Sequence, residues 1–240
     1  MKQQWRIIVL DTINYSSAME IMNNTIKFII SNKEKNNQNV LFLLQHEPVI
    51  TLGKRAKKEN LLLPLNYKQR FPELEITETD RGGDVTFHGP GQLVGYFSAK
   101  VLSLGKNVAD MVRNVSQLII DLLQEYGLQG FFNDELPGIW IESTWGVKKQ
   151  RKIASIGMKI VDKQFVKHGF ALNINNDLNY FNLINPCGLP SDIMTSMEKE
   201  GIKTNVEEVT DTLIKIFSEN REVEILEKQD FLQLIGEPNE

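Results

Sequence analysis

Five glycines and one histidine are concentrated in a single stretch of the chain, DRGGDVTFHGPGQLVGYF, at residues 80–97. The whole sequence of 240 residues contains only 16 glycines. Glycine loses more conformational entropy on folding than any other residue, so a cluster needs a reason, such as positive φ angles or the close approach of a ligand to the backbone. Around the glycines, the sequence predicts a strand, a glycine turn, a second strand and then a third.

Three other segments place apolar residues at helical spacing. They are residues 14–33, 108–127 and 205–220. The predicted boundaries are a cap at Ser16 or Ser17 for the first helix, a stop at Gly127 for the second and a cap at Thr204 or Asn205 for the third.

Runs rich in β-branched and aromatic residues predict strands between these helices. The runs cover residues 5–11, residues 40–53 with a break at Pro48, and residues 138–177, where successive hairpins turn near Trp145 and Gly146. The order is irregular, and no repeat or linker divides the chain. We therefore predict one α+β domain with a mixed β-sheet flanked by helices over residues 1–220, and a polar C-terminal tail over 221–240.

The composition excludes several classes of protein. The net charge of −4 gives no overall basic field for nucleic acid or an anionic membrane, and no apolar run is long enough to span a bilayer. The single cysteine, Cys187, cannot form an intramolecular disulfide, which favours a reducing compartment. With no signal-peptide pattern at the N-terminus, we expect a cytoplasmic protein.

Two local basic clusters stand out from this background, GKRAKKEN at residues 53–60 and VKKQRK at 147–152. Charge runs of this kind are usually solvated surface. Alternatively, these clusters form a binding surface for an acidic partner protein.

The common motifs for phosphate, metal and serine chemistry do not fit. HGPGQLVG places Val94 where a dinucleotide-binding loop needs its third glycine, and neither Gly-Lys pair is followed by Ser or Thr. The three histidines, His46, His88 and His168, are scattered along the chain, so we predict no metal site. ASIGM lacks the first glycine of a serine-hydrolase elbow.

The remaining candidate is nucleophilic chemistry at a cysteine, and the one cysteine is Cys187 in NPCGL. A lone cysteine is more often a small buried hydrophobic residue than a nucleophile, but a flanking proline and glycine suit an exposed, aimed side chain. A thiol with an ordinary pKa of about 8.5 is mostly protonated at neutral pH and needs a neighbouring cation or base. Lys152, at the start of the apolar segment KIASIG, is either that group, pointing into the domain, or a surface lysine in a basic run.

The sequence blocks RGGDVTFHGPGQLVGYF, KIASIG, HGFALNINNDLNYF and NPCGL, with HEPVITLGKRAKKENLL and PGIWI, run in order from about residue 45 to residue 196. Together they resemble the octanoyl-[acyl-carrier-protein]:protein N-octanoyltransferases, the lipoyl/octanoyl transferase family of lipoate biosynthesis. Phe87 departs from the tyrosine that this family usually has before the histidine, and the segment after Cys187 matches more loosely.

The resemblance implies a fold shared with biotin and lipoate ligases. It also implies a transferase that moves an octanoyl group from octanoyl-acyl carrier protein to the ε-amine of a lysine on a lipoyl domain or glycine-cleavage H protein. Cys187 is then the nucleophile that forms an acyl-enzyme, and Lys152 lowers its thiol pKa. The implied acyl-binding residues are Arg81, Gly82, Gly83, Asp84, Val85, Thr86, Phe87, His88, Ser155, Ile156, Gly157, Gly169, Phe170 and Ala171.

From these residues we expect a two-step transfer without a cofactor, since thioester to amide is downhill and needs no ATP. Backbone amides near Gly157 or Gly82 and Gly83 are the candidates for stabilising the oxyanion. His88 either orients or polarises the carbonyl or is structural. We expect a monomer.

Three alternatives stay open. They are an ATP-dependent lipoate or biotin ligase, an amidotransferase that moves octanoyl between two carrier domains, and an inactive module that binds lipoyl domains.

Overall fold

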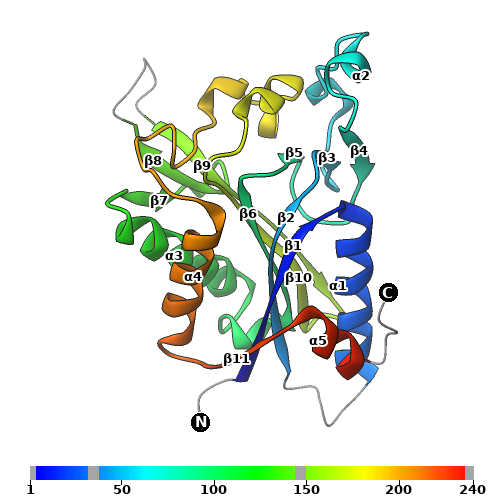
Figure 1. The fold of residues 1–240 in the computed structure, drawn as a ribbon, viewed down its shortest axis with the longest axis vertical. Helices are drawn as coiled ribbons and strands as arrows, with labels where there is room; N and C mark the ends of the chain where they lie inside the picture. Colours follow the sequence, from blue (N-terminus) through cyan, green and yellow to red (C-terminus); the bar gives the residue numbers. More distant parts are fainter. Residues whose placement is uncertain (1–3, 32–37, 144–149, 236–240) are drawn as a thin grey trace.

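The structure, a computed structural model, describes residues 4–31, 38–143 and 150–235, with the side chain of Cys187 outside the described part. An eight-stranded mixed sheet forms its centre, in the order β11-β1-β2-β6-β10-β9-β8-β7 (Figure 1). β1 runs parallel to both β2 and β11, and the other neighbours are antiparallel. The strands are β1 (Gln4–Ile13), β2 (Asn39–His46), β6 (Gln92–Lys100), β7 (Gly130–Phe132), β8 (Ile139–Glu142), β9 (Gln150–Val161), β10 (Phe165–Asn173) and β11 (Glu222–Leu226).

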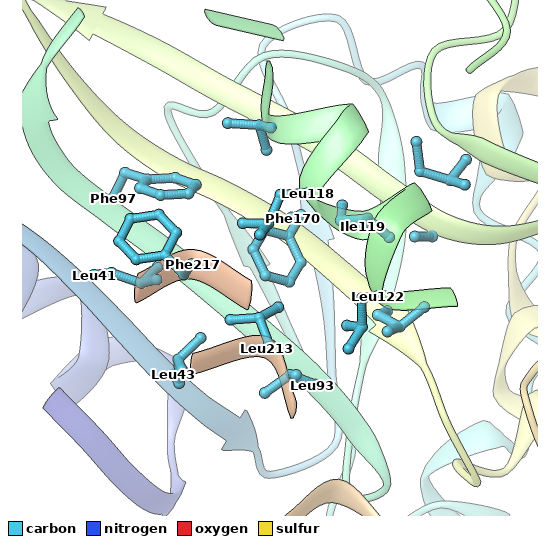
Figure 2. Close-up of a cluster of buried hydrophobic side chains, with 14 of the residues drawn as sticks. Leu41, Leu43, Leu93, Phe97, Leu118, Ile119, Leu122, Phe170, Leu213 and Phe217 are labelled. Carbon is cyan, nitrogen blue, oxygen red and sulfur yellow. The ribbon is translucent and has the colours of Figure 1, made fainter. Parts of the chain in front are cut away.

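Helices cover both faces of this sheet (Figure 1). On one face lie α3 (Val108–Glu125) and α4 (Val206–Ser218), and on the other α1 (Tyr15–Ser31) and α5 (Lys228–Ile235). Figure 2 shows the core under α3 and α4, where Phe170 of β10 lies among Leu118, Ile119 and Leu213. The predicted α+β domain with a mixed, helix-flanked sheet is confirmed.

A second sheet of three strands lies beside the first, in the order β4-β3-β5. It is built from β3 (Val49–Leu52), β4 (Glu75–Glu78) and β5 (Val85–His88). The two strands on either side of the glycine turn do not pair with each other, because each pairs with β3. The break at Pro48, predicted from sequence, is what divides β2 from β3.

Short helical turns connect the remaining elements. They are α2 (Tyr67–Arg70), η2 (Lys58–Asn60), η3 (Val101–Ser103), η4 (Leu178–Leu183), η5 (Pro186–Gly188) and η6 (Ser191–Ile193). No helix in the described ranges is both long and apolar enough to cross a bilayer.

The predicted helices are present, with one correction to the caps. Asn14, rather than Ser16 or Ser17, caps α1, since its side-chain oxygen accepts a hydrogen bond from the backbone N–H of Ser17 at 2.9 Å. The oxygen of Asn205 accepts from Glu208 N at 2.9 Å, which confirms that cap of α4. Gly127 follows α3 with a φ of 76°, the left-handed conformation that ends a helix.

The segment after residue 220 differs from the polar tail that the sequence predicts. β11 adds a parallel strand to β1, and α5 buries Phe231 and Leu232 against the α1 face. The pairing satisfies backbone groups that β1 would otherwise leave exposed as a sheet edge. The predicted turn near Trp145 and Gly146 lies outside the described residues.

Candidate active site

A cavity of about 620 Å³ lies where the glycine turn meets β9, β10 and α3. This volume is within the usual range for small-molecule sites. The cavity combines apolar walls with a few polar groups, and its lining residues come from segments that are far apart in sequence.

Almost all the acyl-binding residues expected from the sequence line this cavity. They are Arg81, Gly82, Gly83, Asp84, Val85, Thr86, His88, Ser155, Ile156, Gly157, Gly169, Phe170 and Ala171. Phe87 does not, because alternation along β5 turns its ring to the other side. It stacks on Tyr180 with ring centroids 4.5 Å apart, and only 1% of its surface is exposed. Its departure from the usual tyrosine therefore lies in a core and not in the cavity.

Other lining residues were not anticipated as site residues. They are Arg55, Tyr96, Val108, Met111, Val112, Phe132, Asp134, Glu135, Leu136, Pro137, Met158, Ile160 and Pro186. Lys152, the catalytic candidate that the sequence names, also lines the cavity. The apolar spacing of α3 predicts only that one helix face is buried. Nothing in that pattern distinguishes a face against a core from a face against a cavity.

The side chain of Arg81 holds the glycine turn in place. Its guanidinium donates to the backbone oxygens of Thr51 at 2.8 Å and Asp84 at 2.7 Å. Gly83 adopts a φ of 91°, which explains a glycine there. The N–H of Gly82 already donates to Met158 O at 3.2 Å, so Gly82 is not a free donor for an oxyanion.

The first basic cluster is fastened to this turn through its backbone. Lys54 N donates to Arg81 O and Arg55 N donates to Gly83 O, both at 3.0 Å. The side chains of Lys54, Arg55, Lys57 and Lys58 are exposed, and Arg55 lines the cavity.

The second basic cluster is not a continuous surface. Arg151 and Lys152 are buried, with 5% and 4% of their surface exposed, while Lys148 and Lys149 lie outside the described residues.

Lys152 points into the domain, as one of its two sequence interpretations predicts. It lies near the start of β9 and lines the cavity, and its ammonium donates to Pro137 O at 2.7 Å. A β-carbon at Gly138 would meet Lys152 Cε at 2.4 Å. Glycine at position 138 therefore leaves the space that the lysine stem occupies.

Cys187 lies in the turn η5, between Pro186, which lines the cavity, and Gly188, whose φ is 75°. This turn packs against β5. The chain then returns to β9, where Thr195 N donates to Lys152 O at 3.0 Å. The backbone of the cysteine turn and the strand of the lysine thus border the same cavity.

The three histidines, scattered in sequence, gather behind the glycine turn. The rings of His46 and His88 are 5.7 Å apart, and Tyr96 contacts both His46 and His168 at 5.7 and 5.9 Å. Within the described ranges no three His, Cys, Asp or Glu side chains form a group able to hold a metal ion. Burial lowers the pKa of His46 to about 4 and holds that of His88 well below its ordinary value. Both rings are therefore neutral at pH 7.

Comparisons with known proteins place this geometry in a family. Residues 6–218 match the family model described as the lipoyl protein ligase A/B catalytic domain. An octanoyltransferase of Caldanaerobacter subterraneus is 36% identical over 92% of this chain and 92% of its own length. An octanoyltransferase of Solibacter usitatus is 38% identical over 90% of this chain and 93% of its own length.

The fold is also found among solved structures. A bipartite lipoate protein ligase from Thermoplasma acidophilum superposes with a TM-score of 0.70 over 94% of this chain and 87% of its own, at 16% identity. At that identity the likeness concerns the fold alone.

Proposed function

This chain belongs to the lipoyl protein ligase A/B catalytic domain family and transfers octanoyl groups, as its curated relatives do, and from that premise we propose its donor, acceptor and mechanism. The donor is octanoyl-acyl carrier protein. The acceptor is the ε-amine of a lysine on a lipoyl domain or on glycine-cleavage H protein. The transfer passes through a thioester on Cys187.

One observation carries this proposal. Lys152 and Pro186, the residue before Cys187, line the same cavity, and one wall of that cavity is apolar. A buried ammonium beside a thiol favours the thiolate, which is the nucleophilic form. An apolar cavity next to that pair suits a saturated acyl chain.

In the first step the Cys187 thiolate attacks the thioester carbonyl. The carbon–sulfur bond to the carrier breaks, and the carrier thiolate leaves with the proton of the Lys152 ammonium, so that Lys152 is left neutral. In the second step the lysine amine attacks the new thioester, the amide forms and Cys187 is released. The incoming amine has an ordinary pKa of about 10.4, so it must lose a proton, and Lys152 in its neutral form is the acceptor that we propose.

The acyl chain lies against the apolar wall of the cavity. This wall consists of Val108, Met111, Val112, Phe132, Ile156, Met158, Ile160 and Phe170. The exposed basic segment at residues 54–58, with Arg55 at the cavity, is the landing surface that we propose for the acidic carrier protein.

The test is the intact mass of the protein after brief incubation with octanoyl-acyl carrier protein, beside Cys187→Ala and Lys152→Met variants. We expect a hydroxylamine-labile octanoyl adduct on the unmodified chain, slow formation on Lys152→Met and none on Cys187→Ala. Active protein without the adduct would contradict the covalent mechanism. A parallel assay with free octanoate and ATP tests the ligase alternative, and an octanoylated lipoyl domain as donor tests the relay alternative.

A further inference from the structure

His88 ends β5 and is one of the polar residues that line the cavity. Only 5% of its surface is exposed, and its ring lies parallel to that of Tyr15, with centroids 6.5 Å apart. Its Nδ1 is 2.7 Å from Oε1 of Gln92. Whether Nδ1 or Nε2 of the His88 ring carries the hydrogen decides what the ring presents to the cavity.

The side-chain amides of Gln92 and Asn173 decide which nitrogen carries the hydrogen, because backbone carbonyls fix the orientation of both amides. Nδ2 of Asn173 donates to Thr195 O at 2.9 Å, which turns the Asn173 oxygen toward Gln92. Nε2 of Gln92 donates to that oxygen at 2.8 Å and to Phe87 O at 3.2 Å. Carbonyl oxygens accept only, so neither amide can be reversed without losing these bonds.

The oxygen of Gln92 therefore faces His88 and can only accept a hydrogen bond. Nδ1 of His88 must donate it, and a neutral imidazole has one N–H. Burial, with His46 and Arg81 nearby, keeps the pKa of His88 well below its ordinary value, so the ring stays neutral. Its second nitrogen, Nε2, then carries a lone pair and no hydrogen.

The other two histidines are engaged differently. His46 donates from Nδ1 to Ile13 O at 3.0 Å and accepts the hydroxyl of Tyr96 at Nε2, 2.9 Å away. His168 donates from Nε2 to Asp80 at 2.7 Å, and its Nδ1 is sealed from solvent. Of the three histidines, His88 alone lines the cavity, and no hydrogen bond from the described residues engages its Nε2.

We infer that His88 is held as the Nδ1–H tautomer and presents Nε2 to the cavity as a hydrogen-bond acceptor for the attacking amine. The inference rests on the proposed acyl transfer for the identity of that amine. An acceptor nitrogen cannot donate to a thioester carbonyl, so the polarising role considered for His88 is replaced by one in the second step. There the ring binds an amine N–H and orients the nitrogen lone pair toward the acyl carbon. Gln92 and Asn173 are positioning residues.

The tautomer is tested first, on the unmodified protein and without substrate. Nitrogen-15 spectra of histidine-labelled protein, assigned with a His88→Phe variant, are expected to show His88 neutral and protonated on Nδ1 at pH 7. A Gln92→Met variant removes the acceptor and is expected to admit the Nε2–H form. Finding Nε2–H or the imidazolium in the unmodified protein would overturn the inference whether or not any variant folds.

The role is tested by separating the two steps. Pre-formed acyl-enzyme of the His88→Phe variant is expected to transfer to the amine about 100-fold more slowly, with a much smaller effect on acyl-enzyme formation. His88→Gln, whose amide oxygen can accept, is expected to recover part of the second step. Equal slowing of both steps, or an unchanged second step, would overturn the role. Absence of any acyl-enzyme on the unmodified chain would instead contradict the proposed function and leave the tautomer result standing.

Discussion

The ammonium of Lys152 donates to the carbonyl of Pro137 at 2.7 Å, and a β-carbon on Gly138, the next residue, would lie 2.4 Å from the Lys152 Cε. The loop therefore holds the lysine in two ways, by accepting its hydrogen bond and by leaving room for its stem. Asn133 braces the same loop, since its side-chain oxygen accepts from the N–H groups of Glu135 and Leu136, both at 3.0 Å.

We expect Gly138→Ala to slow acyl-enzyme formation by about 100-fold, because the new methyl would meet the Lys152 stem at 2.4 Å and the backbone oxygen of Ala154 in the same strand at 2.6 Å, and small misplacements of a reacting group are costly. Single-turnover mass spectrometry measures the rate. Gly127→Ala is the matched control. Its φ of 76° gives strain of roughly 1–2 kcal/mol, but nothing lies within 4 Å of the added carbon. If both variants react at the same rate, Gly138 does not position Lys152.

Chain-length preference is expected to follow burial against the apolar wall that contains Ile156, Met158 and Phe170. Each buried methylene contributes roughly 0.8 kcal/mol, so removing two of them costs roughly 1.6 kcal/mol. A hexanoyl donor should then show kcat/KM about 15-fold lower than an octanoyl donor. Equal values for the two donors would mean that the chain lies outside this cavity.

The basic segment is tested by reversing charge. We expect Lys57→Glu with Lys58→Glu to weaken binding of octanoyl-acyl carrier protein about tenfold at low salt, with a smaller difference at high salt. Lys203→Glu with Lys228→Glu makes the same change in net charge on exposed lysines outside the segment. If both pairs of substitutions weaken carrier binding equally, the net charge of the protein, and not the basic segment, accounts for the effect.

Acid should destabilise the fold through its buried histidines. Burial lowers the pKa of His46 in the folded chain to about 4, against about 6.5 when unfolded. Between these values the unfolded chain binds a proton that the folded chain does not. The stability is therefore complete above pH 6.5 and falls as the pH drops toward 4, by roughly 3 kcal/mol for this residue.

Urea unfolding at pH 7, 5.5 and 4.5 measures this loss. A His46→Gln variant is expected to show a shallower fall, since one of the titrating groups is gone. An unchanged slope would show that His46 is not the group responsible.

Much of the local structure follows from the sequence. The spacing of Met111, Val115 and Leu122 predicts α3, Asn205 predicts the start of α4, and Pro48 predicts the break between β2 and β3. These features depend on residues within a turn or two of each other, which is the range over which propensity and capping act.

The sequence predicts less about how the side chains of the site are oriented. Lys152 is one of several cations in a basic run, and pairing of β9 with β8 and β10 turns it inward. In β11 the residues Glu222 to Ile225 alternate charged and apolar, a short strand pattern that the interpretation as a polar tail overlooks, and parallel pairing with β1 makes this segment part of the sheet.

The sequence alone establishes most of the elements up to α4, the glycine turn and, through its ordered blocks, the family and about half of the residues that line the cavity. Tertiary structure alone decided that Phe87 faces away from that cavity, that α3 and the loop before β8 close it, and that the amides of Gln92 and Asn173 set the hydrogen on His88. Each of these depends on contacts between residues distant in the chain, whose geometry exists only once the sheets have paired.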